Sequence, residues 1–148
     1  MSAVTYEKLK RRVSEHLNAQ VKEFRQTVGD IARNFRELGL ETAVWYPEKI
    51  HTVNIGGLDA DSYVGYSRIE GKWGLIVRTI EHDHDSHAFV SQRVYPVESC
   101  GNMEIVVNAL RKVRELVEYI HKATEQQIKV LAQADQEFGD LRNPECQF

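Results

Sequence analysis

The sequence predicts an α+β fold in which two long amphipathic helices flank a four- to five-stranded antiparallel meander sheet, in the order α-β-β-β-β-α. Apolar residues recur every three or four positions near both ends of the chain, which is typical of helices. The middle holds short β-prone segments separated by turn signals. The 148 residues are expected to form a single α+β domain, residues 1–148, with a helix at 5–38, a sheet at 43–97, a helix at 102–138 and a loose tail at 140–148.

The first helix is predicted from one apolar stripe. The stripe consists of Leu9, Val13, Leu17, Val21, Phe24, Val28, Ile31, Phe35 and Leu38. From Leu17 onward its steps alternate between four and three, which is the heptad spacing of a coiled coil. Thr5 fits an N-cap and Gly39 a left-handed stop. Gly29, inside the helix, predicts a close helix approach or a bend.

The sheet is predicted from five β-prone segments. They read AVWY (43–46), IHTVNI (50–55), SYVGYSRI (62–69), WGLIVRTIE (73–81) and AFVSQRVYPV (88–97). Turns are expected at residues 56–61, 70–72 and 83–86, so successive strands should be neighbours. Trp73, Leu75 and Val77 alternate with Ile76 and Ile80, so both faces of the sheet carry apolar residues that favour cover.

The second helix is expected to begin at Asn102, a good N-cap. Its apolar seam consists of Val106, Leu110, Val113, Val117, Ile120, Leu131, Ala134 and Phe138. Ile105, Leu116 and Ile128 lie beside this seam and broaden it.

The dimensions of these elements favour a homodimer. A helix of the predicted length extends about 50 Å, whereas a strand covers about 28 Å and four strands are about 15 Å across. The apolar stripes therefore continue beyond the sheet, and either the helices cover each other within one chain or a second chain covers them. The predicted interface consists of Val21, Phe24, Val28, Ile31, Phe35, Val113, Val117 and Ile120.

A histidine cluster, HDHDSH at residues 82–87, is the main candidate for chemistry. The spacing of His82, His84 and His87 resembles the H-x-H-x-x-H motif of the metallo-β-lactamase hydrolases, over these six residues only. That resemblance implies a bound divalent transition metal, with a second metal served by an aspartate where Ser86 stands here. The sequence favours a different interpretation, a polar hairpin tip that solvates its own turn.

Other residues suggest further functions. Cys100 precedes a helix, where the dipole favours a thiolate, but an inert buried thiol is the simpler interpretation. Residues 8–12, KLKRR, could contact phosphates, although a solvated helix face explains them and the net charge of −3 makes nucleic acid an unfavoured partner. Five aromatic residues, Trp45, Tyr46, Tyr63, Tyr66 and Trp73, form either core or an exposed binding surface.

These observations predict a non-catalytic cytoplasmic protein-binding or scaffold module that acts as a homodimer, with room for another protein partner. The sequence suggests no catalytic residue, no organic cofactor and no membrane partner, since it has no long apolar run or signal-like start. The first alternative is a small metal-dependent hydrolase that uses His82, His84 and His87. The second is a nucleic-acid-binding accessory protein.

Overall fold

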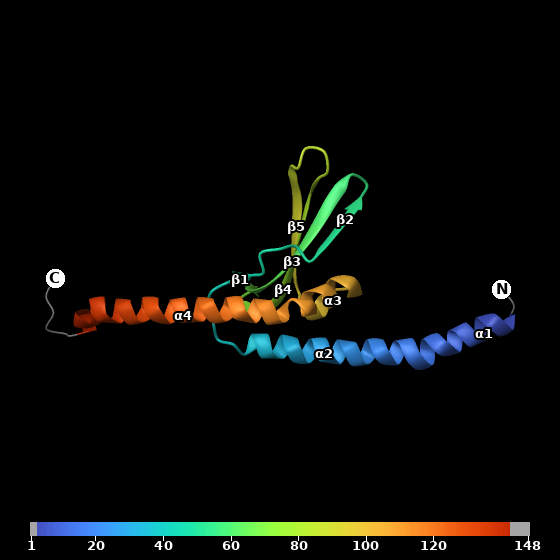
Figure 1. Cartoon of the computed structure of the whole chain (residues 1–148), viewed down its shortest axis with the longest axis horizontal. Coiled ribbons are helices and arrows are strands. Elements are labelled where there is room, and N and C mark those ends of the chain that lie inside the picture. The colour runs from blue at the N-terminus through green and yellow to red at the C-terminus, as the bar shows by residue number, and fades with distance from the viewer. Residues whose placement is uncertain (1–2, 143–148) are drawn as a thin grey trace.

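Long helices lie at the two ends of the chain, and the strands lie between them in sequence (Figure 1). The computed structural model describes the backbone of residues 3–142 and the side chains of residues 5–142. The helical elements are α1 (Ala3–Arg12), a π turn (Val13–Leu17), α2 (Asn18–Arg36), a 3-10 turn (Val97–Ser99), α3 (Met103–Arg111), α4 (Val113–Phe138) and a closing 3-10 turn (Gly139–Arg142). The strands are β1 (Val44–Trp45), β2 (His51–Ile55), β3 (Leu58–Ile69), β4 (Lys72–Asp83) and β5 (Phe89–Pro96). The α+β class and the order of the elements are confirmed.

The first predicted helix is one rod, made of α1, the π turn and α2 in direct succession. Its predicted N-cap is wrong, because α1 already includes Ala3 and Thr5 therefore lies inside the helix. Its stop is as predicted, since Gly39 has a φ of +73°, which glycine adopts without strain. Gly29 marks no close approach, because a Cβ built there would meet nothing within 4 Å.

The π turn explains how the apolar stripe stays continuous along this rod. Leu9, Val13, Leu17 and Val21 are each four residues apart, and in a regular α-helix every such step rotates the stripe by about 40°. A π turn takes up more residues than an α turn. Its place at Val13–Leu17 therefore reduces this rotation and keeps the four side chains nearer to one side.

The sheet has five antiparallel strands in the order β1-β3-β4-β5, with β2 also paired to β3. β1 and β2 follow one another along the same edge of β3, opposite residues 65–66 and 58–62 respectively. The β2–β3 turn is shorter than predicted, because only Gly56 and Gly57 form it, with φ of +60° and +82°. Glu70 and Gly71 form the β3–β4 turn in the same way. Positive φ at both central residues is typical of type I′ hairpins.

The second predicted helix is divided into α3 and α4 at Lys112. Asn102 is its N-cap as predicted, since its side chain accepts hydrogen bonds from the backbone N–H groups of Glu104 and Ile105. Leu116, expected beside the seam, is fully buried, whereas Val117, expected on the seam, is 49% exposed.

Residues 140–142 of the predicted tail belong to the 3-10 turn that follows α4, which has no buried residue. The rest of the predicted tail, residues 143–148, lies outside the described residues, and so does Cys146.

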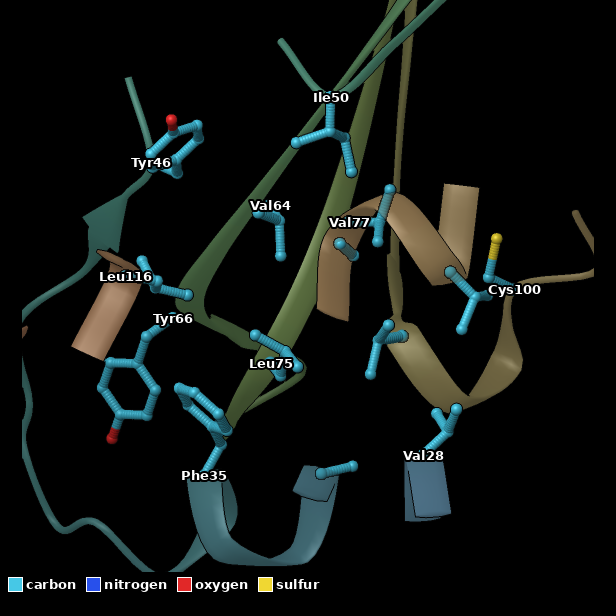
Figure 2. Packing of buried hydrophobic residues seen from close by; sticks show 14 of the residues in the cluster. Val28, Phe35, Tyr46, Ile50, Val64, Tyr66, Leu75, Val77, Cys100 and Leu116 are labelled. Atoms are coloured by element: carbon cyan, nitrogen blue, oxygen red, sulfur yellow. The ribbon is translucent and has the colours of Figure 1, made fainter. Parts of the chain in front are cut away.

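The hydrophobic core lies between the helices and one face of the sheet (Figure 2). Val28 and Phe35 of α2 approach from below, and Leu116 of α4 comes from the side, in the view of Figure 2. They meet Val64 of β3 and Leu75 of β4. Burying such a side chain contributes about 1.5–3 kcal/mol, so this middle part of the helices is fixed to the sheet.

Candidate functional site

The histidine cluster lies at the free end of the sheet, and the sheet register explains its contacts. His82 stands opposite Asp59 on β3 and its Nε2 lies 3.3 Å from Asp61 Oδ2. His84, just beyond β4, has its Nδ1 2.9 Å from Asp59 Oδ2. Hydrogen bonds from Asn54 and then from His84 hold the pKa of Asp59 below its usual value. The two histidines therefore have separate aspartate partners across the strand pair.

His87 belongs to the turn rather than to these pairs. Its φ is +58°, and its backbone N–H donates to the carbonyl oxygen of Asp83 at 2.8 Å. The Asp83 carboxylate accepts hydrogen bonds from the backbone N–H groups of Ser86 and Asp85, which lower the pKa of Asp83. These contacts are those of a self-capped hairpin tip. Among residues 3–142, no three His, Cys, Asp or Glu side chains are grouped so that they could hold a metal ion.

The aromatic residues divide between the two faces of the sheet. Tyr66 stacks on Trp73 at 5.2 Å between ring centroids, and its hydroxyl donates to the Leu40 carbonyl oxygen within the core. On the opposite face the Arg78 guanidinium lies 4.2 Å from the Trp45 ring and 5.7 Å from that of Tyr63. The five aromatics therefore do not form one exposed surface.

Gly65 makes room for the outer-face stack. A Cβ at Gly65 would overlap the indole of Trp45, which lies across it. A glycine in a strand often marks such a close approach.

A pocket of about 490 Å³ lies on the helix-covered side of the sheet, between its free end and the start of α3. Ser62 and Thr79 share a hydrogen bond of 2.8 Å at its wall, and Thr79 lies 3.2 Å from the Tyr95 hydroxyl. Burial raises the pKa of Tyr95. Glu81 and Arg93 form an ion pair at 3.2 Å. These polar groups pair with one another, whereas His51, which also lines the pocket, has a buried Nδ1 without a hydrogen-bond partner.

Cys100 also lines this pocket, as a free thiol that is only 3% exposed. The thiol donates to the Asn102 carbonyl oxygen at 3.5 Å and lies 3.9 Å from the Tyr95 hydroxyl. Figure 2 shows it at the margin of the hydrophobic cluster. These contacts fit the structural interpretation of the residue better than the nucleophilic one.

The first rod and a second rod, formed by α3 and α4, both extend past the sheet, as their predicted lengths require (Figure 1). We call residues 5–21 the N-terminal overhang. Its exposed apolar residues are Tyr6, Leu9, Val13, Leu17 and Val21. Leu17, for example, is 52% exposed although it lies on the same stripe as the fully buried Val28.

We call residues 124–142 the C-terminal overhang. Its exposed apolar residues are Ile128, Val130, Leu131, Phe138 and Leu141. Leu131 also borders a shallow groove with Leu38 and Leu40, at the point where α2 ends. In the described residues, no helix has the combination of length and apolarity that a membrane span requires.

The predicted interface residues lie mostly in the core of the chain itself. Val28, Phe35 and Ile120 are buried in the cluster, and Phe24, Ile31 and Val113 are half-buried against it. Only Val21 and Val117 of the predicted set are exposed. The exposed apolar residues of each helix lie further from the sheet than the predicted interface residues do. A sequence-based prediction could find them by measuring how far each apolar position of the helix extends beyond the expected length of the strands.

No protein-family model, curated protein or solved structure matches this chain.

Proposed function

We propose that this protein is a non-catalytic protein-binding or scaffold module that works as a homodimer. The observation that carries the proposal is the continuation of both apolar helix stripes past the sheet, where Leu9, Leu17, Leu131 and Phe138 are about half exposed or more. Monomeric proteins rarely expose large contiguous apolar surfaces, and such surfaces typically mark interfaces. A second chain that covers the overhangs with coiled-coil-like packing supplies the missing contact.

The energy available supports this assembly. Fully burying an exposed Leu or Phe side chain contributes about 1.5–3 kcal/mol, so a side chain that is already half covered contributes about half of that, and a symmetric dimer uses each residue twice. Association itself costs about 4–15 kcal/mol. The exposed residues of both overhangs, counted in two chains, are therefore sufficient to offset that cost.

We place the binding surface for a further protein partner at the hairpin ends of the sheet. The hairpin ends of the sheet rise away from the helices (Figure 1), and they carry Ile55, Phe89 and Val90, which are 71%, 67% and 50% exposed. β5 is an edge strand, so its outer backbone groups are available for pairing with an added strand. The free thiol of Cys100 suits the reducing cytoplasm, where we place the module.

The test replaces two overhang leucines by a charged residue. We expect L9E/L17E to weaken dimerisation at least about a hundredfold, because each glutamate would be buried without a partner. The control is A19E/Q26E, which adds the same charge at exposed positions about half a turn from the stripe. Light scattering measures mass, and circular dichroism checks that helix content is kept. A double variant that keeps the dimeric mass of the native protein would contradict the proposal.

A further inference from the structure

The arrangement of the overhangs indicates how a second chain would bind. We infer that two copies pair antiparallel, so that the N-terminal overhang of each chain packs on the C-terminal overhang of the other. The inference rests on the proposed homodimer and adds which surfaces meet. Three features support it: the direction of the rods, their matched lengths and their charges.

The two rods run in the same direction along the longest axis of the molecule. Figure 1 shows the start of α1 at one end of that axis and the end of α4 at the other, with the sheet attached between them. The two overhangs of one chain therefore protrude at opposite ends and cannot cover each other while the core is intact. A two-fold axis perpendicular to the rods reverses the second copy. At each end of the dimer, the N-terminal overhang of one chain then lies beside the C-terminal overhang of the other.

The two overhangs match in length, and each carries an apolar stripe. Residues 5–21 and residues 124–142 are each about 25–28 Å long at the rise of an α-helix. Leu9, Val13 and Leu17 recur at steps of four across the π turn, and Leu131 and Phe138 are one heptad apart. Each overhang therefore offers apolar side chains along one side of its helix for a paired helix to cover. One closed dimer of this kind covers both stripes and leaves no unpaired overhang to recruit further copies.

The charges of the overhangs are opposite. The N-terminal overhang has four Lys or Arg residues against two Glu, and all four lie within residues 8–12. The C-terminal overhang has two Lys or Arg residues against four Asp or Glu, and three of the four are Asp135, Glu137 and Asp140. Antiparallel pairing places the basic segment beside these three acidic residues. Pairing like overhangs would place basic beside basic and acidic beside acidic, which is unfavourable.

Charge reversal tests this pairing. The basic-end variant is K8E/R11E/R12E, the acidic-end variant is D135K/E137K/D140K, and a third variant carries all six changes. These side chains are exposed, so the fold should be kept in each variant. We expect either triple variant to raise the dimer dissociation constant at least about tenfold, because the attraction between the basic and acidic segments becomes repulsion at both ends of the dimer. The variant with all six substitutions should have a dissociation constant within about threefold of the native value, because its charges are again complementary.

Sedimentation equilibrium of the full chain measures the dissociation constants. The control for the basic-end variant is K72E/R111E/R114E, which makes the same change of net charge at exposed positions outside the overhangs and should leave the constant unchanged. If the native protein dimerises but neither triple variant weakens it, the proposed function stands and the antiparallel pairing is wrong. If both triples weaken it and the variant with all six substitutions does not recover, the pairing is also wrong. A native protein that is monomeric overturns the proposed function itself.

Discussion

The same apolar stripe is buried in the middle of each rod and exposed at its free end. Val28 and Phe35 are 0% and 4% exposed where α2 packs on the sheet, whereas Leu9 and Leu17, on the same rod, are 49% and 52% exposed. In α4, Leu116 is fully buried and Leu131 is 59% exposed. An apolar helix stripe therefore identifies residues that favour a packing surface. The length of the sheet decides which of these residues pack within the chain. The predictions below test this contrast between covered and uncovered segments.

The largest effect is expected from truncating one leucine in each segment. Leu116→Ala should lower the free energy of unfolding by about 2–5 kcal/mol at any protein concentration, because it leaves a cavity in the core. Leu131→Ala should destabilise the dimer at high concentration and should have a smaller effect after dilution, because this side chain is 59% exposed in the single chain and the proposed second chain covers it. Urea unfolding at two protein concentrations measures both variants. An equal loss for Leu131→Ala at both concentrations would place the C-terminal overhang in the core of the chain itself.

A smaller effect is expected at Gly29, which lies in the covered segment of α2. Gly29→Ala should raise the free energy of unfolding by about 0.5–1 kcal/mol, because alanine is the better helix former and a Cβ meets nothing within 4 Å. The dissociation constant should not change, because the second chain is placed on the overhangs. Gly71→Ala is the matched control and should destabilise the protein, since Gly71 has a φ of +80°. Dimer loss in Gly29→Ala would mean that the second chain packs on the sheet-bound part of α2.

The smallest effect is expected at the exposed charge pairs of the sheet end. Hydrogen bonds from Asn54 and His84 lower the pKa of Asp59 in the folded protein, so the unfolded chain binds the proton more readily. The resulting stability is complete above about pH 4–5, where unfolded aspartate is ionised, and is lost as the pH falls through the lower folded value. Asp59→Asn should therefore show a smaller loss of stability than the native protein between pH 6 and pH 2.5.

Urea midpoints across this pH range provide the measurement. Identical curves for the native protein and Asp59→Asn would show that the Asp59 contacts do not favour the ionised carboxylate.

The element types and their order could be predicted from residue periodicity and turn signals, because both are local properties. The choice between Leu116 and Val117 could not, because both lie three or four residues from Val113 and Ile120, and only packing on the sheet decides that Leu116 is the buried one. The break between α3 and α4 has no local signal either, since Lys112 is neither proline nor glycine. The histidine cluster depends on pairing: Asp59 and Asp61 lie far from His82 and His84 in sequence, and only the β3–β4 register brings them together.

The interface prediction needed the same long-range information. The heptad seam identifies Val28 and Leu17 as members of one stripe, but the position of the sheet along the rod decides that Val28 is buried and Leu17 exposed. The pocket beside α3 had no local signal at all, because its lining comes from four strands and the start of α3.

The central claim is that a second copy of the chain covers the uncovered stripes. The mass of the native protein, measured by light scattering after gel filtration over a concentration series, tests it most directly. We expect twice the 17.1 kDa of the single chain at high concentration, with dissociation only on dilution. A mass of one chain at every concentration would contradict the claim.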